Sequence, residues 1–216
     1  MKKGLFITFE GPEGSGKSTQ IKRLGALLER TNMPFVLTRE PGGTKNPLLR
    51  NYLLEQYEDK FAYEAELFLF LADRTQHVKE LLEPALNENK IVICDRYTDS
   101  TLAYQGGGRG FSIDLLRILN KAATGGLKPD ITILFDVPVE IGLKRAETSK
   151  NRKDRMEREP ISFHRRVRKA YLSIAKKEKK RFLVLDCRKS EEDVYQAMLE
   201  GLIDRLPLRK KGVRNG

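Results

Sequence analysis

Three observations predict an α/β fold for this chain of 216 residues: a three-layer sandwich around a five-stranded, mostly parallel sheet. Short apolar runs recur along the chain, and several are near-continuous, as expected of strands buried on both faces. Segments with helical periodicity lie between them, which gives the strand–helix–strand repeat of a parallel sheet. The length suits one core, so we expect a single domain over residues 1–216.

The expected elements alternate from the start of the chain. The apolar runs predict five strands: Leu5–Glu10, Phe35–Thr38, Ile91–Asp95, Ile131–Asp136 and Phe182–Asp186. The helical periodicity predicts seven helices between and after them: Lys17–Arg30, Pro47–Gln56, Glu64–Asn87, Ser112–Thr124, Val139–Glu147, Pro160–Lys180 and Glu191–Leu206. Ligands bind such sheets at the carboxyl ends of the strands, and every motif described below falls at one of those ends.

Composition excludes several classes of protein. Hydrophobic residues make up 39% of the chain and charged residues 33%, which is unlike disordered or collagen-like sequences. No apolar run is long enough to cross a bilayer, and the opening MKKGLFITFE lacks the apolar stretch of a signal peptide. We expect a soluble, cytoplasmic protein without a membrane partner, in which Cys94 and Cys187 are buried free thiols.

The net charge of +11 could indicate a nucleic-acid partner, but its distribution argues against one. Residues 144–181 contain 16 Lys and Arg residues against 5 acidic ones, so this segment holds the entire excess. The rest of the chain is electrically balanced. We therefore expect no nucleic-acid partner, and a regulatory or nucleic-acid-binding protein is the non-enzymatic alternative that charge alone would favour.

The segment Gly11–Ser18, GPEGSGKS, fits the pattern G-x-x-x-x-G-K-[ST] between the first expected strand and the first expected helix. Its glycines let backbone N–H groups turn inward around phosphates, Lys17 adds a mobile positive charge, and Ser18 can ligate Mg²⁺. A dinucleotide-binding loop spaces its glycines as G-x-G-x-x-G and has no role for Lys17. A plain glycine turn is the other alternative. We expect a P-loop that binds a nucleoside triphosphate.

The expected strand Ile91–Asp95 ends near the P-loop, and Arg96 follows its last residue, Asp95. The carboxylate of Asp95 can hold Mg²⁺ directly or through water, and Arg96 can face an incoming phosphate. A plain ion pair between the two side chains is the alternative.

Phe70 and Arg74 lie four residues apart, on one face of the expected helix Glu64–Asn87. An aromatic ring and a forked donor at this spacing suit a nucleobase, which could stack on Phe70 and be read by Arg74. Phe70 could equally be a core residue. Glycine-dense loops follow two of the strands, Glu40–Thr44 between Arg39 and Arg50, and Tyr104–Gly110, and would permit close approach of a ligand or movement.

A basic stretch lies between two expected helices and consists of Arg145, Lys150, Arg152, Lys153, Arg155 and Arg158. In a P-loop protein, a basic flap at about residues 147–159 could neutralise charge on a transferring phosphoryl group. A solvated charged face is the alternative. The basic segment 209–216 is expected to be a frayed tail.

Five motifs, in order, resemble the thymidylate kinase family of the bacterial kind: FEGPEGSGKSTQ, TREPGGT, ELFLFLADR, DRYTDSTLAYQGGGRG and LKPDITILFDV. The resemblance runs from about Phe6 to the last helix, and the fourth motif is its most specific part. It implies a fold of the P-loop kinase type and transfer of the γ-phosphoryl group of ATP to dTMP, giving dTDP and ADP for dTTP synthesis. A kinase for another monophosphate, such as dUMP, UMP or dCMP, is the alternative.

The resemblance assigns residues to two nucleotide sites. Arg145 stacks on the adenine of ATP. The rest of the ATP site is formed by the P-loop residues Gly11, Pro12, Glu13, Gly14, Ser15, Gly16, Lys17, Ser18 and Thr19. Ser18 and Asp95 hold Mg²⁺. The acceptor dTMP is held by residues around its phosphate, sugar and base: Arg50, Arg96, Glu13, Tyr104, Phe70, Arg74, Thr101 and Gln105. In this scheme Glu13 faces the 3′-hydroxyl and Tyr104 disfavours a 2′-hydroxyl.

The resemblance also implies the source of the charge-stabilising arginine. This P-loop contains no arginine, so the flap supplies it through Arg152 or Arg155, beside the catalytic residues Lys17 and Arg96. Phosphoryl transfer needs positioning and charge neutralisation rather than a covalent nucleophile, and neither His77 nor His164 stands in a nucleophile pattern. Members of the family are generally homodimers, and the helix Glu64–Asn87 could contribute to such an interface.

Overall fold

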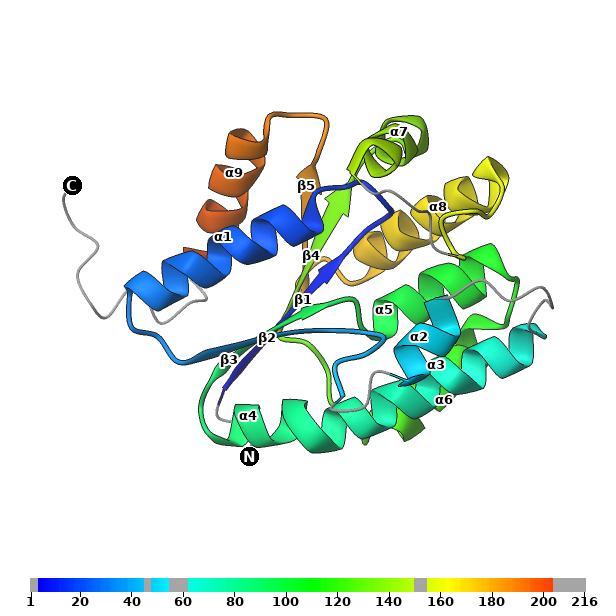
Figure 1. Cartoon of the computed structure of the whole chain (residues 1–216), viewed down its shortest axis with the longest axis horizontal. Helices are drawn as coiled ribbons and strands as arrows, with labels where there is room; N and C mark the ends of the chain where they lie inside the picture. The colour runs from blue at the N-terminus through cyan, green and yellow to red at the C-terminus, as the bar shows by residue number, and fades with distance from the viewer. Residues whose placement is uncertain (1–3, 45–47, 55–61, 150–154, 204–216) are drawn as a thin grey trace.

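The computed structural model describes residues 4–44, 48–54, 62–149 and 155–203, and these form a three-layer α/β sandwich (Figure 1). Its sheet contains β1 (Leu5–Glu10), β2 (Phe35–Arg39), β3 (Ile91–Asp95), β4 (Ile131–Asp136) and β5 (Phe182–Asp186). The spatial order is β2-β3-β1-β4-β5, and each of these neighbouring pairs is parallel. The fold class and all five strands expected from the sequence are confirmed.

One face of the sheet is covered by α1 (Lys17–Arg30) and α9 (Glu191–Ile203), which lie side by side (Figure 1). Side chains alternate across a strand, so Ile7 and Phe9 of β1 point to this face. There they join a core that includes Leu24 of α1 and Met198 of α9, all fully buried.

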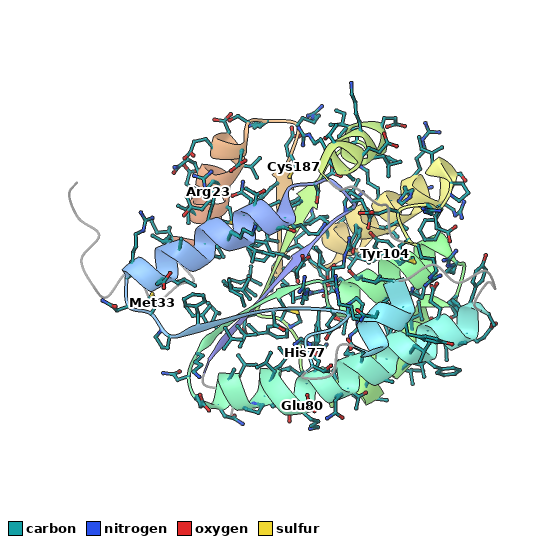
Figure 2. The ribbon with its side chains drawn as sticks, viewed as in Figure 1. Arg23, Met33, His77, Glu80, Tyr104 and Cys187 are labelled. Atoms are coloured by element: carbon teal, nitrogen blue, oxygen red, sulfur yellow. The ribbon has the colours of Figure 1, made fainter. Side chains whose placement is uncertain are left out.

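The opposite face packs on a longer set of helices. A continuous helical run lies across it, formed by α3 (Tyr63–His77), the π-helical η1 (Val78–Leu82) and α4 (Glu83–Asn87). Phe6 and Val92 of the sheet contact Val78 and Leu82 of this run. The run matches the expected helix at 64–87, and Figure 2 shows His77 on its inner side and Glu80 on its outer side.

The remaining helices are α2 (Leu48–Leu54), α5 (Thr98–Thr101), η2 (Leu102–Gly108), α6 (Ile113–Thr124), α7 (Val139–Ser149) and α8 (Ile161–Lys177). Among them, α8 packs on β4 and β5 through a second core cluster that includes Val167, Leu134 and Phe182. Each expected helix is present, and the ends that fall within the described residues differ from the expected ones by at most three residues. None of the helices in the described ranges has the length and apolar character that a membrane span requires.

The glycine-rich segment that begins at Tyr104 differs from the expected loop, because its first part belongs to η2, a π-helix. The glycines of this segment serve helix packing. A Cβ at Gly107 would lie 2.5 Å from Cβ of Ala170, and one at Gly108 would lie 2.3 Å from the ring of Phe163, both on α8. The expectation of a loop is wrong for residues 104–108, since they are helical and the close packing of η2 on α8 requires residues without side chains.

Two expected features lie outside the described residues. These are the tail at 209–216 and the part of the basic flap at 150–154. The flap residues Arg155 to Glu159 are described and are discussed below.

Candidate active site

One large cavity, of about 670 Å³, opens at the carboxyl ends of the strands. It brings together side chains from α1, α3, η2, α7 and the segments that follow β1, β2 and β3. Sixteen of the residues expected at the two nucleotide sites line it: Glu13, Gly14, Ser15, Gly16, Lys17, Ser18, Thr19, Arg50, Phe70, Arg74, Asp95, Arg96, Thr101, Tyr104, Gln105 and Arg145. Gly11, Pro12 and Arg155 do not line it, and Arg152 lies outside the described residues.

The P-loop wraps around the start of α1. Gly14 has φ +64°, and a Cβ there would stand 1.9 Å from the carbonyl oxygen of Gly142 on α7, so this position requires glycine. The first helical residue is Lys17, and the N-terminal N–H groups of a helix attract anions. Ser18 and Thr19 follow with exposed side chains at the cavity.

Lys17 is held against its own loop. Its Nζ donates to the carbonyl oxygens of Gly11 and Pro12, both at 2.9 Å, and to Oγ of Ser15 at 3.2 Å. Burial, together with the nearby Arg96 guanidinium, lowers the pKa of Lys17 to about 8. The lysine is therefore a cation with little solvent around it, and an anion bound in the loop would find a poorly screened charge.

Arg96 adopts a backbone conformation that is rare for its residue type. Its φ is +70°, in the left-handed region, and its N–H donates to the carbonyl oxygen of Phe9 at 3.0 Å. From this position the guanidinium donates to the carbonyl oxygen of Gly11 at 3.1 Å and to Oε1 of Glu13 at 2.8 Å. The strained turn at the end of β3 thus aims Arg96 back at the P-loop, in the manner of strain retained at functional sites.

A buried carboxylate fixes the chain on both sides of this turn. Oε1 of Glu10 accepts from the backbone N–H of Tyr97 at 2.8 Å, and Oε2 accepts from Ser100 at 2.6 Å and Tyr171 at 2.9 Å. Burial and the neighbouring Asp99 raise the pKa of Glu10. Sequence reasoning missed Glu10 and Tyr171, because β3, β4 and β5 also end in an acidic residue and Glu10 did not stand out among them.

Glu13 joins Arg96 to the wall of the cavity. Its Oε1 also accepts from the hydroxyl of Tyr104 at 2.6 Å, and the Arg96 guanidinium lies 5.0 Å from the Tyr104 ring centroid. Burial opposes ionisation of Glu13, but the Arg96 guanidinium and other nearby donors outweigh it and hold the pKa of this carboxyl well below its usual range. Burial, with the Glu13 carboxylate beside it, holds the pKa of Tyr104 well above its usual value, so the phenol remains a donor.

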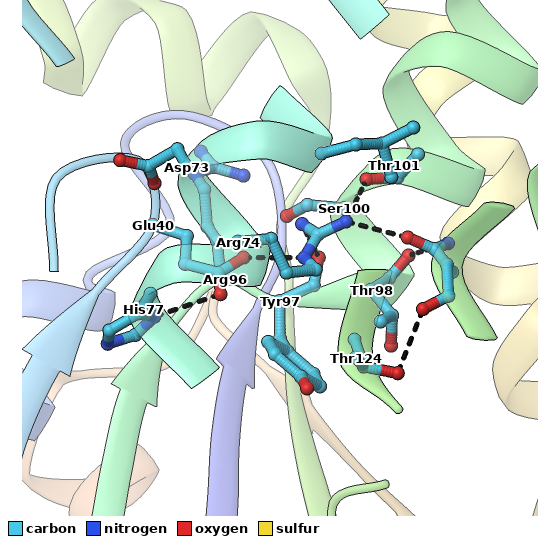
Figure 3. A network of polar contacts seen from close by, with 12 residues as sticks. Glu40, Asp73, Arg74, His77, Arg96, Tyr97, Thr98, Ser100, Thr101 and Thr124 are labelled. Carbon is cyan, nitrogen blue, oxygen red and sulfur yellow. Dashed lines mark hydrogen bonds and ion pairs between the residues drawn. The ribbon is translucent and has the colours of Figure 1, made fainter. Parts of the chain in front are cut away.

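Arg74 is the centre of the polar network in Figure 3. Its Nε donates to Glu40 at 2.7 Å, its Nη1 to Thr101 at 2.7 Å and Asn120 at 2.6 Å, and its Nη2 to the carbonyl oxygen of Tyr97 at 3.0 Å. These contacts occupy four of the five N–H groups of the guanidinium. Arg74 lines the cavity while only 2% exposed, so its position is set before any ligand binds.

Phe70 lies one helical turn before Arg74 and also lines the cavity. Its side chain is partly exposed, whereas Leu67 and Leu71 of the same helix are buried in the core. A partly exposed aromatic ring beside a fixed forked donor suits a planar ligand. The structure therefore favours the ligand-binding interpretation of Phe70 over the core interpretation.

Glu40 bridges Arg74 to a second helix residue, which the sequence did not reveal. Its Oε1 lies 2.9 Å from Nδ1 of His77, and Nε2 of His77 lies 2.8 Å from the hydroxyl of Thr38. Glu40, Arg74 and His77 are almost fully buried. Glu40, which follows β2, therefore holds the Arg74 guanidinium in its position at the cavity.

Replacing Glu40 with alanine should lower the free energy of unfolding by about 3–5 kcal/mol, because it leaves the buried Arg74 without its counter-charge. Urea unfolding followed by circular dichroism measures this change. The exposed Glu88→Ala, which removes a surface ion pair with Lys90, is the matched control and should change stability by less than about 1 kcal/mol. Equal effects of the two substitutions would contradict the role of Glu40.

The described part of the flap is anchored on another buried glutamate. Glu66, fully buried, lies 2.6 Å from Nη1 of Arg155 and 3.1 Å from Nη2 of Arg109, and accepts from Gln105 at 3.0 Å. Nε of Arg155 donates to the carbonyl oxygen of Leu53 at 3.1 Å. The Arg155 guanidinium therefore lies at Glu66 rather than at the P-loop in this structure.

Two further arginines line the cavity at opposite ends. Nη1 of Arg145 on α7 donates to the carbonyl oxygen of Cys187 at 2.8 Å, on the α9 side of the P-loop. Nη1 of Arg50 on α2 donates to the carbonyl oxygen of Pro41 at 2.5 Å, on the side of Arg74. The cavity is therefore lined by cations along its length, namely Lys17, Arg39, Arg50, Arg74, Arg96, Arg145 and Lys189.

No cluster of three or more His, Cys, Asp or Glu side chains suited to a metal ion occurs among the described residues. A metal held by protein side chains alone is not indicated there. The hydroxyl of Ser18 lies at the cavity, and Oδ1 of Asp95 is buried without a hydrogen bond from any described residue. This pair fits a metal ion whose other ligands are phosphate oxygens and waters.

Comparison with known proteins gives a consistent result. Residues 9–198 match the family model described as thymidylate kinase. The chain is 48% identical over 210 residues to thymidylate kinase of Desulfosudis oleivorans, covering 94% of this chain and 98% of that protein. It is 50% identical over 217 residues to thymidylate kinase of Desulfovibrio desulfuricans, covering 97% and 100% respectively.

A solved structure agrees with these relatives. The crystal structure of thymidylate kinase from Ehrlichia chaffeensis aligns with a TM-score of 0.73 at 36% sequence identity, and the alignment covers 92% of this chain and 98% of that one. The match in fold therefore extends over nearly the whole of both chains.

Proposed function

Because the chain belongs to the thymidylate kinase family, it transfers the γ-phosphoryl group of ATP to dTMP, and we propose which of its residues carry out each part of this reaction. The observation that supports the assignment best is the position of Arg96. It lies in one cavity between the P-loop, suited to ATP, and the Phe70–Arg74 pair, suited to a base. Two nucleotides placed end to end would meet at this arginine.

For the donor, we propose that the P-loop residues Gly11 to Thr19 surround the phosphates of ATP. Lys17 would leave the carbonyl groups that it now contacts and follow the β- and γ-phosphates, which are stronger acceptors for a poorly hydrated ammonium. Arg145 would stack on adenine at the far end of the cavity.

For the acceptor, we propose that Arg96 and Arg50 bind the 5′-phosphate of dTMP. Phe70 stacks on thymine, and the remaining N–H of Arg74 donates to a ring oxygen, with Thr101 and Gln105 beside the base. Glu13 and Tyr104 lie between these two groups, at the level of the sugar, and both line the cavity. There Glu13 accepts from the 3′-hydroxyl, and the Tyr104 ring leaves no room for a 2′-hydroxyl.

We propose that Mg²⁺ enters with ATP and is held by the hydroxyl of Ser18 and, directly or through water, by Asp95. Oδ1 of Asp95 supports this site, because it has no hydrogen-bond donor among the described residues, and a buried carboxylate oxygen without a donor is costly unless a cation approaches it. When bound, the ion neutralises charge on the phosphates.

The transfer itself needs no protein nucleophile, since the phosphate oxygen of dTMP is already ionised at neutral pH. Arg96 holds this oxygen in line with the γ-phosphate, and Lys17 stabilises charge on the donor side. We propose that a flap arginine stabilises the transferring group. Arg152 is the first candidate, because Arg155 would have to leave Glu66 to reach the phosphates.

The function is tested by measuring ADP release from Mg-ATP with dTMP, dUMP, UMP, dCMP and AMP as separate acceptors. We expect kcat/KM to be highest for dTMP by orders of magnitude. A higher kcat/KM for another monophosphate would contradict the proposed recognition of thymine by Phe70 and Arg74. It would not affect the assignment of the ATP site.

Replacing Phe70 with alanine should raise KM for dTMP by about tenfold, the effect of losing roughly 1–2 kcal/mol of stacking. Steady-state kinetics at saturating ATP measures this change, and KM for ATP in the same variant is the internal control. Phe70→Tyr keeps the aromatic face and should retain most of the affinity. An unchanged KM for dTMP in Phe70→Ala would show that Phe70 does not bind the base and would favour its interpretation as a core residue.

We also propose that the chain is one kinase domain that works in the cytoplasm as a homodimer. Large apolar side chains are exposed together on α3 and α6, namely Phe68 at 60%, Leu115 at 45% and Ile118 at 66%, and they support a subunit interface there. Light scattering should give about twice the chain mass of 24.8 kDa, and the mass of a single chain would contradict the dimer.

A further inference from the structure

His164 is a buried residue to which the mechanism above gives no task. It lies on α8, is 1% exposed, and neither of its ring nitrogens makes a hydrogen bond with the described part of the chain. Such a group is rare in folded proteins and calls for an explanation. A phenylalanine would fill the same volume without burying two unsatisfied nitrogens, so packing alone does not account for histidine here.

The ring of His164 faces the carboxylate of Glu13. Nδ1 lies 3.6 Å from Oε2 of Glu13, longer than a hydrogen bond, and this Oε2 also lacks a hydrogen-bond donor among the described residues. The other oxygen, Oε1, accepts from both Arg96 and Tyr104. One half of the carboxylate is thus fixed, whereas among the described residues the side chain that comes within ion-pair distance of Oε2 is His164.

In the proposed arrangement of the acceptor, Oε2 of Glu13 lies at the level of the sugar, between the arginine proposed for the 5′-phosphate and the pair proposed for the base. The deoxyribose of dTMP has one hydroxyl, at the 3′ position. A carboxylate oxygen can accept two hydrogen bonds, so Oε2 can accept one from the 3′-hydroxyl and another from an imidazole N–H. His164 does not line the cavity, so its effect on a ligand would pass through Glu13.

We propose that His164 is a positioning residue whose Nδ1–H holds Oε2 of Glu13 in place to accept the 3′-hydroxyl of the acceptor nucleotide. The inference rests on the proposed function of the site. Contacts of catalytic groups are often long in the free enzyme and shorten when the substrate binds, and Nδ1 needs to approach by less than 1 Å, to about 2.9 Å. The bound hydroxyl would draw the carboxylate into a fixed orientation between Arg96, Tyr104 and His164.

The test compares two acceptors that differ only at the 3′ position, dTMP and 3′-deoxythymidine 5′-monophosphate. The preference for dTMP, taken as the ratio of the two kcat/KM values, is measured for the wild type, His164→Phe and His164→Asn. We expect His164→Phe to reduce the preference on the order of tenfold, the effect of weakening one hydrogen bond to a charged group. The kcat/KM for the 3′-deoxy acceptor should change by less than about twofold.

His164→Asn is the matched variant, because an asparagine amide N–H can take the place of Nδ1–H. It should keep most of the preference for dTMP. The ratio is measured within one preparation, so a reduced folded fraction in either variant does not affect it. Thermal unfolding of each variant shows separately how far packing is disturbed.

Three results would overturn the inference: an unchanged preference in His164→Phe, an equal loss with both acceptors, or the same loss of preference in His164→Asn as in His164→Phe. Failure of the proposed function would look different. In that case the wild type would not phosphorylate dTMP, or it would not discriminate between the two acceptors. If Glu13→Gln lost the preference while His164→Phe kept it, Glu13 would still be the residue that recognises the 3′-hydroxyl. The positioning role of His164 alone would then be wrong.

Discussion

Replacing Arg96 with alanine should lower kcat for dTMP phosphorylation by about 10³-fold or more, the range found when a charge-stabilising arginine is removed from phosphoryl-transfer enzymes. Arg96 lies where the two nucleotides would meet and contacts the P-loop through the Gly11 carbonyl oxygen. Alanine removes the donor that orients the acceptor oxygen. Rapid-quench assays with saturating ATP and dTMP measure the loss.

The variant should still fold, because Glu13 can take up a proton once its counter-charge is gone. Its thermal midpoint is expected to fall, and the far-ultraviolet circular dichroism spectrum should be retained. Arg117→Ala is the matched control, since Arg117 is exposed on α6 and pairs only with Asp114 at 3.4 Å among the described residues. Full turnover in folded Arg96→Ala would remove Arg96 from the mechanism.

Replacing Lys17 with alanine should also abolish measurable turnover, with a loss on the order of 10³-fold, through the donor nucleotide. Burial makes the Lys17 charge poorly screened, and its three loop contacts hold the ammonium within reach of a bound phosphate. The loss should appear in kcat as well as in KM for ATP, because charge on the donor grows during transfer. Affinity for dTMP, measured by calorimetry without ATP, should change little.

Lys22→Ala provides the comparison on the same helix, since Lys22 is an exposed lysine of α1. It should leave kcat and both KM values near those of the wild type. If Lys17→Ala raised only KM for ATP and kept kcat, Lys17 would contribute to ATP binding and not to the transition state.

The sequence predicted the sheet and its helices well because buried parallel strands leave a direct signal. Runs such as Ile91–Asp95 are apolar at nearly every position, and the helical periodicity between them is equally clear. Only tertiary packing could reveal η2. Its glycines suggest a loop by local propensity, and the helix exists because Gly107 and Gly108 pack against Ala170 and Phe163.

The candidate site was predictable where a motif carries its own chemistry. The P-loop needs only its spacing, whereas the helix face shared by Phe70 and Arg74 suits a core position equally well, and the family resemblance was needed to favour a base site. Glu40, Glu10 and His164 carry no such signal, because their partners are 34, 161 and 151 residues away along the chain respectively: Arg74, Tyr171 and Glu13. A buried polar residue becomes informative only when the fold shows what it faces.

The four contacts of Arg74 have a consequence for inhibitor design. A long side chain normally loses on the order of 2 kcal/mol of rotational entropy when a ligand immobilises it, but folding has already immobilised this one. A ligand can therefore use the guanidinium at little entropic cost. It can, however, receive only the one N–H that the network leaves over, so compounds that present a single carbonyl oxygen at this point should bind better than compounds that present a carboxylate.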